Sequence, residues 1–247
     1  MNKSPETVME FNSSITEFDI KSANTSLMRF YNLLPVKDIE KLEKLPKEKR
    51  EIAVGLLCQK DKDLSKKLNS AFDDIVNLFI KENSLDDLEI LSIKKDAVFV
   101  INRKNIVSDF GPVHFIPKNK YTDFIQIGNF EFYLNDKVIH VKGLQKQAEK
   151  HEDGILYLIR DIVSVCNKTL MNRSVINTYL ADLALSYKLK ELDYAMYREF
   201  NQNSMFAVFM DGEKYYFDTI DDTYLGELDI HYNYVNIILP LIRILLS

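Results

Sequence analysis

The sequence predicts an α+β protein in which an antiparallel sheet with packed helices is followed by a mainly helical region with a C-terminal β-hairpin. The first reason is that strand-like apolar runs between residues 88 and 141 follow one another directly, as in hairpins, and do not alternate with helices. The second is that stretches with the apolar spacing of helices precede and follow these runs. The third is that Gly and Pro are scarce, at 7 and 6 residues, so long flexible linkers are not expected.

The first half is predicted to open with a strand that turns into helices. Residues 15–30 begin as a strand, and their Ser, Asn and Thr cluster indicates a turn into a helix. Residues 37–57 have helical spacing, with Pro46 marking a break or the start of a second helix. Residues 63–82 form the clearest helix, and Asp63 is its expected N-cap.

Antiparallel strands come next. Residues 88–92 and 97–102 predict a hairpin with Asp96 at or beside its turn. Further strands are expected at residues 113–116, 123–127, 130–134 and 138–141. After these, helices are expected at residues 145–170 and 173–200, then a hairpin of residues 205–210 and 214–218. We place a domain boundary near Leu144, which divides residues 1–144 from residues 145–247.

Composition and charge narrow the possible functions. The net charge of −5 argues against binding nucleic acid through bulk positive charge. The charge is uneven, because residues 94–150 carry ten Lys and Arg against six Asp and Glu, whereas residues 211–229 carry seven acidic residues and one lysine. A basic middle could meet phosphates; the alternative is that both stretches are ordinary solvated surface.

No segment predicts export or a membrane span. Residues 1–14 lack the basic and apolar regions of a signal peptide. The apolar run at residues 235–246 is too short to cross a bilayer and contains Arg243, so we expect a buried final helix. Cys58 and Cys166 are far apart and have no His or Cys at ligand spacing, which indicates a reducing compartment. We therefore expect a cytoplasmic protein without a membrane partner.

Two aspartates stand at the ends of strands that are expected to be neighbours. Asp19 opens the pattern Asp-x-x-Ser-x-x-x-Ser-Leu, and Asp96 lies within Lys-Asp-Ala-Val-Phe. Carboxylates on neighbouring strands could hold a pair of Mg²⁺ ions, which stabilise the attacking and leaving oxygens of a phosphoryl transfer. Between them, residues 66–72 read Lys-Lys-Leu-Asn-Ser-Ala-Phe on the clearest helix.

These segments resemble the palm of family B DNA polymerases. The Asp19 segment resembles motif A, D-x-x-S-L-Y-P-S-I, and the Asp96 segment resembles the end of motif C, D-T-D-S-V-F. Residues 66–72 resemble motif B, K-x-x-x-N-S-x-Y-G. Residues 118–121, Lys-Asn-Lys-Tyr, resemble the K-K-R-Y element that contacts primer-template DNA, and residues 141–144 resemble the K-G-x element that follows it. The matches occur in the family's order and span roughly residues 15–144.

The resemblance implies a minimal palm with reduced fingers in residues 1–144, a thumb-like region in residues 145–247 and no exonuclease domain. It implies template-directed nucleotidyl transfer with two Mg²⁺, or Mn²⁺, held by Asp19 and Asp96 as catalytic residues. The implied nucleotide-binding residues are Ser22, Lys66, Asn69, Ser70 and Phe72; those for nucleic acid are Lys118, Lys120, Tyr121 and Lys142. The partners would be primer-template DNA, a deoxynucleoside triphosphate and other replication or transcription proteins, in the host cytoplasm of a virus.

The segments also depart from the family's motifs. Motif C normally carries two aspartates, whereas Lys94 and Lys95 stand before Asp96 here. The lysine and glycine of motif B are replaced by Ser65 and Asp73. A second hypothesis is therefore a catalytically degenerate, polymerase-derived subunit that binds nucleic acid or assembles a complex. In it, a lysine of the Lys94–Lys95 pair would bridge to the motif A aspartate. A third is an unrelated α+β interaction protein.

Each candidate residue also has a simpler role. Asp19 could cap the following helix, and Asp96 could be an ordinary turn residue. The polar pair Asn69 and Ser70 could be the solvated stripe of an amphipathic helix. The lysines could protect an exposed sheet edge from strand pairing.

Overall fold

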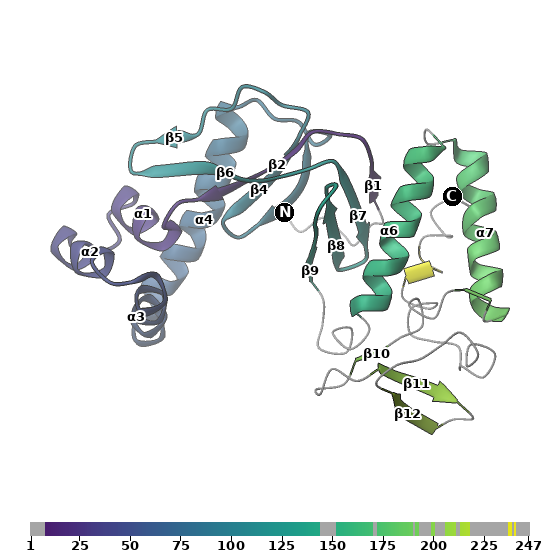
Figure 1. Ribbon diagram of the computed structural model, residues 1–247. Coiled ribbons are helices and arrows are strands. Elements are labelled where there is room, and N and C mark those ends of the chain that lie inside the picture. Colours follow the sequence, from purple (N-terminus) through teal and green to yellow (C-terminus); the bar gives the residue numbers. More distant parts are fainter. Residues whose placement is uncertain are drawn as a thin grey trace. The chain divides into compact units, whose positions relative to one another are not determined.

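The structure is a computed structural model that describes residues 8–143, 152–169, 172–189, 191–192, 199–200, 206–210, 213–217, 237–238 and 240. The fold is α+β with antiparallel sheets, as predicted (Figure 1). The chain forms two compact units, Ser13–Tyr121 and Met1–Asn12 with Thr122–Ser247. This division differs from the expected boundary near Leu144, because the strands after Tyr121 pack with the helices that follow them.

The unit Ser13–Tyr121 contains a five-stranded antiparallel sheet in the order β3-β4-β2-β6-β5. Its elements are β2 (Ile15–Ile20), α1 (Ala23–Phe30), α2 (Val36–Glu43), α3 (Lys47–Lys60), α4 (Lys62–Glu82), β3 (Ile90–Lys94), β4 (Ala97–Ile101), β5 (Asp109–Phe110) and β6 (Val113–Tyr121). The predicted strand-to-helix turn, the break at Pro46 and the hairpin before and after Asp96 are all confirmed.

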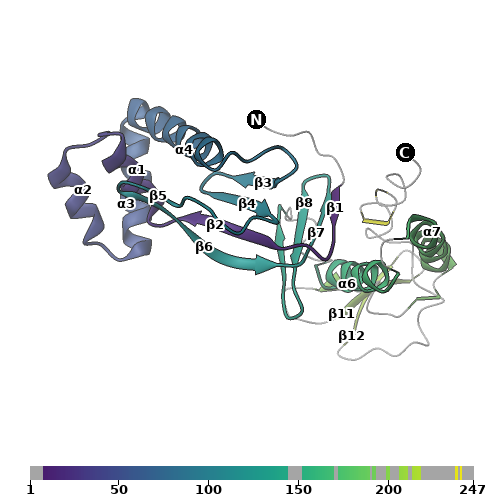
Figure 2. The same cartoon turned by 90° about the horizontal axis from the view of Figure 1, so that it is seen from above.

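Helix α4 lies along one face of this sheet (Figure 2). The buried residues of α4 recur at helical spacing, and they pack against alternate residues of β2, β4 and β6, since alternate strand residues share a face. Phe79 is central to this core: its ring centroid lies 4.3 Å from that of Phe115 and 5.6 Å from that of Phe18. The remaining residues of β2 therefore point to the other face of the sheet.

The N-terminus of α4 is capped by Asp61, so the prediction of Asp63 as the cap is wrong. The Asp61 carboxylate accepts hydrogen bonds from the backbone N–H groups of Asp63, at 3.0 Å, and Leu64, at 2.9 Å. Asp63 instead lies in the first turn, where it forms an ion pair of 2.7 Å with Lys67. Asp61 and Asp63 have the same side chain and lie two residues apart, so the sequence alone does not distinguish them. The extended backbone of Asp61 identifies it as the cap.

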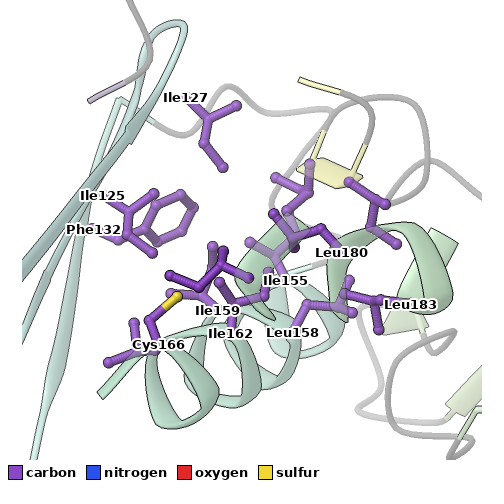
Figure 3. Packing of buried hydrophobic residues seen from close by; sticks show 14 of the residues in the cluster. Ile125, Ile127, Phe132, Ile155, Leu158, Ile159, Ile162, Cys166, Leu180 and Leu183 are labelled. Atoms are coloured by element: carbon purple, nitrogen blue, oxygen red, sulfur yellow. The ribbon is translucent and has the colours of Figure 1, made fainter. Parts of the chain in front are cut away.

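The second unit contains the sheets β1-β7-β8-β9 and β10-β11-β12. Its elements are β1 (Val8–Glu10), β7 (Asp123–Ile127), β8 (Phe130–Leu134), β9 (Ile139–Lys142), α6 (Glu152–Lys168), α7 (Arg173–Leu189), β10 (Glu199–Phe200), β11 (Phe206–Met210) and β12 (Glu213–Phe217). Figure 3 shows the core in which Ile125 and Phe132 face Ile159 and Cys166 of α6. This core explains why β7–β9 belong with the later helices.

The predictions for this unit are mostly confirmed. Strands β7 and β8 have the predicted bounds, and the β11–β12 hairpin is present, although its turn lies outside the described residues. The second long helix was expected to reach Phe200, but α7 ends at Leu189 and Phe200 belongs to a strand. Of the predicted final helix, the described residues Ile237 and Ile238 are buried. None of the helices in the described ranges is both long and apolar enough to cross a lipid bilayer.

Candidate functional site at the Asp19 end of the sheet

Asp19 lies near the end of β2, and Asp96 lies in the turn that leads into the neighbouring strand β4, as the sequence led us to expect. In the antiparallel pairing of β2 with β4, Asp19 lies opposite Ala97, the residue after Asp96. The backbone N–H of Ile20 also donates a 3.0 Å hydrogen bond to the carbonyl of Asp96. The end of β2 and the β3–β4 turn are therefore held side by side by main-chain bonds.

The Asp19 carboxylate is bound by a lysine from the strand on the other side. The Nζ atom of Lys118, on β6, lies 2.7 Å from Oδ2 of Asp19. The Asp19 side chain is 21% exposed and that of Lys118 is 53% exposed, so the carboxylate is the more enclosed partner. The sequence hypothesis gave this place to Lys94 or Lys95, whereas the ion pair seen in the structure is formed by Lys118.

A β-bulge in β6 directs the side chain of Lys118 toward Asp19. Glu17 pairs with Asn119 and Phe18 pairs with Pro117, so Lys118 has no residue opposite it on β2. Pro117 has no N–H for the ladder, and proline within a strand commonly accompanies such an irregularity. A bulge adds one residue to the strand and redirects the side chain. Pro117 is the sequence signal that could have predicted the arrangement.

Glu17 adds a buried carboxylate two residues from Asp19. Phe18 and Ile20 of β2 face α4, so Glu17 and Asp19 face the opposite side of the sheet. Oε2 of Glu17 accepts hydrogen bonds from Nδ2 of Asn119, at 2.6 Å, and from the Tyr121 hydroxyl, at 3.1 Å. Burial, and then the charge of Glu17, raise the pKa of Tyr121, which therefore stays protonated. Tyr121 is only 2% exposed, so its ring packs inside the protein.

The carboxylates keep Lys118 charged. The hydrogen bond to Asp19 raises the pKa of Lys118 most. Partial burial lowers that pKa, and the negative charges of Asp19, Glu17 and Asp96 raise it. One ammonium group therefore compensates a group of carboxylates that come from both β2 and the β3–β4 turn.

The predicted nucleotide-binding residues on α4 are not brought together. Phe72 is 3% exposed and belongs to the core, with Nζ of Lys95 lying 4.5 Å from its ring centroid. The other three, Lys66, Asn69 and Ser70, are exposed on the solvent side of the helix. A nucleotide could not stack on Phe72 without opening this core.

Ser22 lies at the turn that joins β2 to α1, close to Asp19 in the chain. It adopts the left-handed conformation, with φ of 51°, and its carbonyl accepts hydrogen bonds from the backbone N–H groups of Thr25 and Ser26. The hydroxyl of Ser26 donates to the carbonyl of Lys21 at 2.9 Å. These local bonds let the chain pass from strand to helix within two residues.

The predicted nucleic-acid residues are divided between the two units. Lys118, Lys120 and Tyr121 lie on β6, where Lys120 pairs with Thr16 rather than with Asp19. Lys142 belongs to the other unit, on β9, and its Nζ lies 5.7 Å from the ring centroid of Tyr133. Of this set, Lys118 is the residue that contacts Asp19.

The carboxylates present do not suit a pair of Mg²⁺ ions. Mg²⁺ takes oxygen ligands in octahedral geometry, and Asp19 and Asp96 offer few oxygens for two such ions. Lys118 already lies within hydrogen-bond distance of Asp19, where its charge would repel a divalent cation. Within the ranges that the structure describes, no group of three or more His, Cys, Asp or Glu side chains is placed to hold a metal.

A concave region lies between α6 and α7 in the other unit. It is lined by Asp161, Ser174, Val175, Thr178, Tyr179, Asp182, Leu183, Ser186 and Leu192. The hydroxyl of Tyr179 donates a 2.5 Å hydrogen bond to Asp161, and burial, followed by this bond, raises the pKa of Tyr179. Among the described residues that line this groove there is no lysine or arginine, so these residues offer no positive charge to a phosphate.

Fold and site together define an α+β protein in which a lysine from the neighbouring strand forms an ion pair with an aspartate near a strand end. A family model described as bacteriophage PBS1 gene 130 protein matches residues 5–247, and the chain belongs to this family of bacteriophage proteins. This membership agrees with the viral origin expected from the sequence. No DNA polymerase family is matched, and no curated protein gives a significant match.

Proposed function

We propose that the protein is a phage subunit that binds nucleic acid through the Asp19 end of its sheet and does not catalyse nucleotidyl transfer. It would be derived from a polymerase-like palm in which Lys118 supplies the positive charge that metal ions supply in an active palm. The observation that carries the proposal is the 2.7 Å contact between Lys118 and Asp19. The protein would act in the host cytoplasm beside other replication or transcription proteins.

The lysines near this end of the sheet support a role in binding phosphates. Lys21 follows β2, and its backbone N–H bonds to His114 of β6. Lys94 pairs with Ala97, which itself pairs with Asp19, and Lys95 stands in the adjoining turn. Together with Lys118, they make four lysines on or next to β2, β6 and the β3–β4 turn, with Nζ of Lys95 lying 4.5 Å from the ring centroid of Phe72. Such a surface contacts the sugar-phosphate backbone without reading the sequence.

Active polymerization by two metal ions is the rival function, since Asp19 on β2 pairs with Ala97, the residue that follows Asp96. Primer extension with purified protein and Mg²⁺ or Mn²⁺ separates the two. We expect no incorporation of nucleotides. Incorporation that disappears in both Asp19→Ala and Asp96→Ala would overturn the proposal in favour of a polymerase.

Binding of a fluorescent single-stranded or primer-template DNA tests the proposal directly. We expect the double variant Lys21→Ala/Lys95→Ala to bind about tenfold more weakly and to lower the salt slope by about 1 to 2. Lys137→Ala is the matched control, because Lys137 is an exposed lysine in the β8–β9 turn of the other unit. Equal losses in the control and the double variant would contradict the placement of the site.

Asp19→Asn gives opposite results for the two functions. The substitution removes the negative charge that holds Lys118, so we expect DNA affinity to rise about threefold to tenfold. In a metal-dependent polymerase, the same change would remove a metal ligand and abolish activity. Unchanged affinity together with absent polymerization would favour a role in complex assembly.

A further inference from the structure

His114 lies at the same end of the sheet, and its side chain points away from the core that packs against α4. It alternates along β6 with Val113 and Phe115, which are buried in the core against α4. His114 therefore faces the opposite side of the sheet, together with Ile116, the residue that pairs with Asp19. Two residues along a strand span about 7 Å, so His114 is one such step from the Asp19 pair.

Asp109 fixes the orientation of the His114 ring. Nδ1 of His114 lies 2.6 Å from Oδ1 of Asp109, its cross-strand partner on β5. The imidazole is half exposed, at 48%, so a ligand can reach it. With Nδ1 carrying the proton shared with Asp109, the neutral ring has only the lone pair of Nε2 to offer. The protonated ring donates a hydrogen bond from Nε2 instead.

The charged groups around His114 come from two other elements. Asp109 reaches it from β5, and Lys21 stands at the end of β2, where its N–H bonds to the His114 carbonyl at 2.9 Å. On its own strand, Lys118 follows four residues later and is bound to Asp19. Protonation changes the His114–Asp109 pair from a net charge of −1 to neutral, beside the lysines already described.

We propose that His114, oriented by Asp109, is a further contact for nucleic-acid phosphate and makes binding stronger at low pH. This inference rests on the proposed function. A phosphate oxygen is an acceptor, so it gains a hydrogen bond from Nε2 only when the imidazole is protonated. Histidine changes charge near pH 6.5, whereas carboxylates titrate well below this range. Binding between pH 8.0 and 5.5 therefore reports chiefly on histidines.

The test is the dissociation constant of a fluorescent single-stranded oligonucleotide at pH 8.0, 6.5 and 5.5, at constant ionic strength. We expect the wild-type protein to bind about fivefold more tightly at pH 5.5 than at pH 8.0, from one added charge-assisted contact. In His114→Gln, most of this gain should be lost, while affinity at pH 8.0 stays within twofold. His140→Gln, on β9 of the other unit, is the matched control and should keep the gain.

Asp109→Asn distinguishes an oriented contact from a general change of charge. The substitution removes the carboxylate that orients the ring, so the gain in affinity at pH 5.5 should be smaller than in the wild-type protein. A pH-dependent gain that persists in His114→Gln overturns this inference but leaves the proposed function standing. If the wild-type protein binds no nucleic acid at any of the three pH values, both proposals fail.

Discussion

Replacing Lys118 by methionine removes the ammonium that lies 2.7 Å from Asp19 while keeping most of the length of the side chain. The two halves of this ion pair differ in exposure, at 21% for Asp19 and 53% for Lys118. After Lys118→Met, a largely enclosed carboxylate remains near Glu17 and Asp96 with its counter-ion gone. After Asp19→Asn, the ammonium remains half in water and can be solvated.

The exposures therefore predict unequal losses of stability. We expect Lys118→Met to lower the free energy of unfolding by about 1 to 2 kcal/mol, as for a polar group left without its partner. Asp19→Asn should lower it by about 0.5 kcal/mol or less, in the range of exposed ion pairs. The coupling energy from the double-mutant cycle should be about 1 kcal/mol.

Urea unfolding of the four proteins at pH 7 measures these differences. The raised pKa of Lys118 adds a pH dependence, because a base with a higher pKa in the folded state stabilises the fold while it is protonated. This contribution is complete below the unfolded lysine pKa of about 10.4 and is lost as pH rises through the folded value. The difference between wild type and Lys118→Met should therefore shrink above about pH 10.4. Equal losses in the two single variants, or a coupling energy near zero, would refute the reasoning.

Three further predictions concern stability. Asp61→Ala removes the N-cap of α4 and should cost about 1 kcal/mol in urea unfolding, whereas Asp63→Ala should cost clearly less; the reverse order would show that the cap is misassigned. Tyr121→Phe removes a hydrogen bond to the buried Glu17 and should cost about 1 to 2 kcal/mol, and a neutral result would mean that the remaining partners of Glu17, Asn119 among them, satisfy that carboxylate. Gly143→Ala should lower the melting temperature by several degrees, because Gly143 has φ of 83° and an added Cβ would lie 2.0 Å from a backbone oxygen; an unchanged melting temperature would count against this close approach.

Local signals explain which elements could be predicted. Strands β7 and β8 are runs rich in Phe, Ile and Tyr on either side of Gly128, whose φ of 58° suits the turn between them. The break between α2 and α3 follows from Pro46, which begins a helix readily but cannot continue one. The N-cap of α4 was predicted at Asp63 instead of Asp61, because both residues are aspartates and aspartate is favoured at an N-cap.

The candidate site could be predicted only in part. The sequence placed Asp19 and Asp96 at strand ends, and the pairing of β2 with β4 brings those strands together. The sequence also predicted that Phe72 contacts a nucleotide. The spacing that places Phe72 beside Asn69 on α4 equally suits a core position. The structure buries Phe72, because the stripe of α4 to which it belongs packs on the sheet.

By itself, the sequence determined the class of fold, most strand and helix positions and the presence of two aspartates at strand ends. These features depend on periodicity and on turn residues within short segments. The tertiary structure alone decided which cation lies against Asp19. Lys94 and Lys95 are the lysines beside Asp96 in the sequence, but Lys118, 99 residues from Asp19, forms the ion pair. A pairing across strands and a bulge at one residue set that contact, and both depend on the register of the whole sheet.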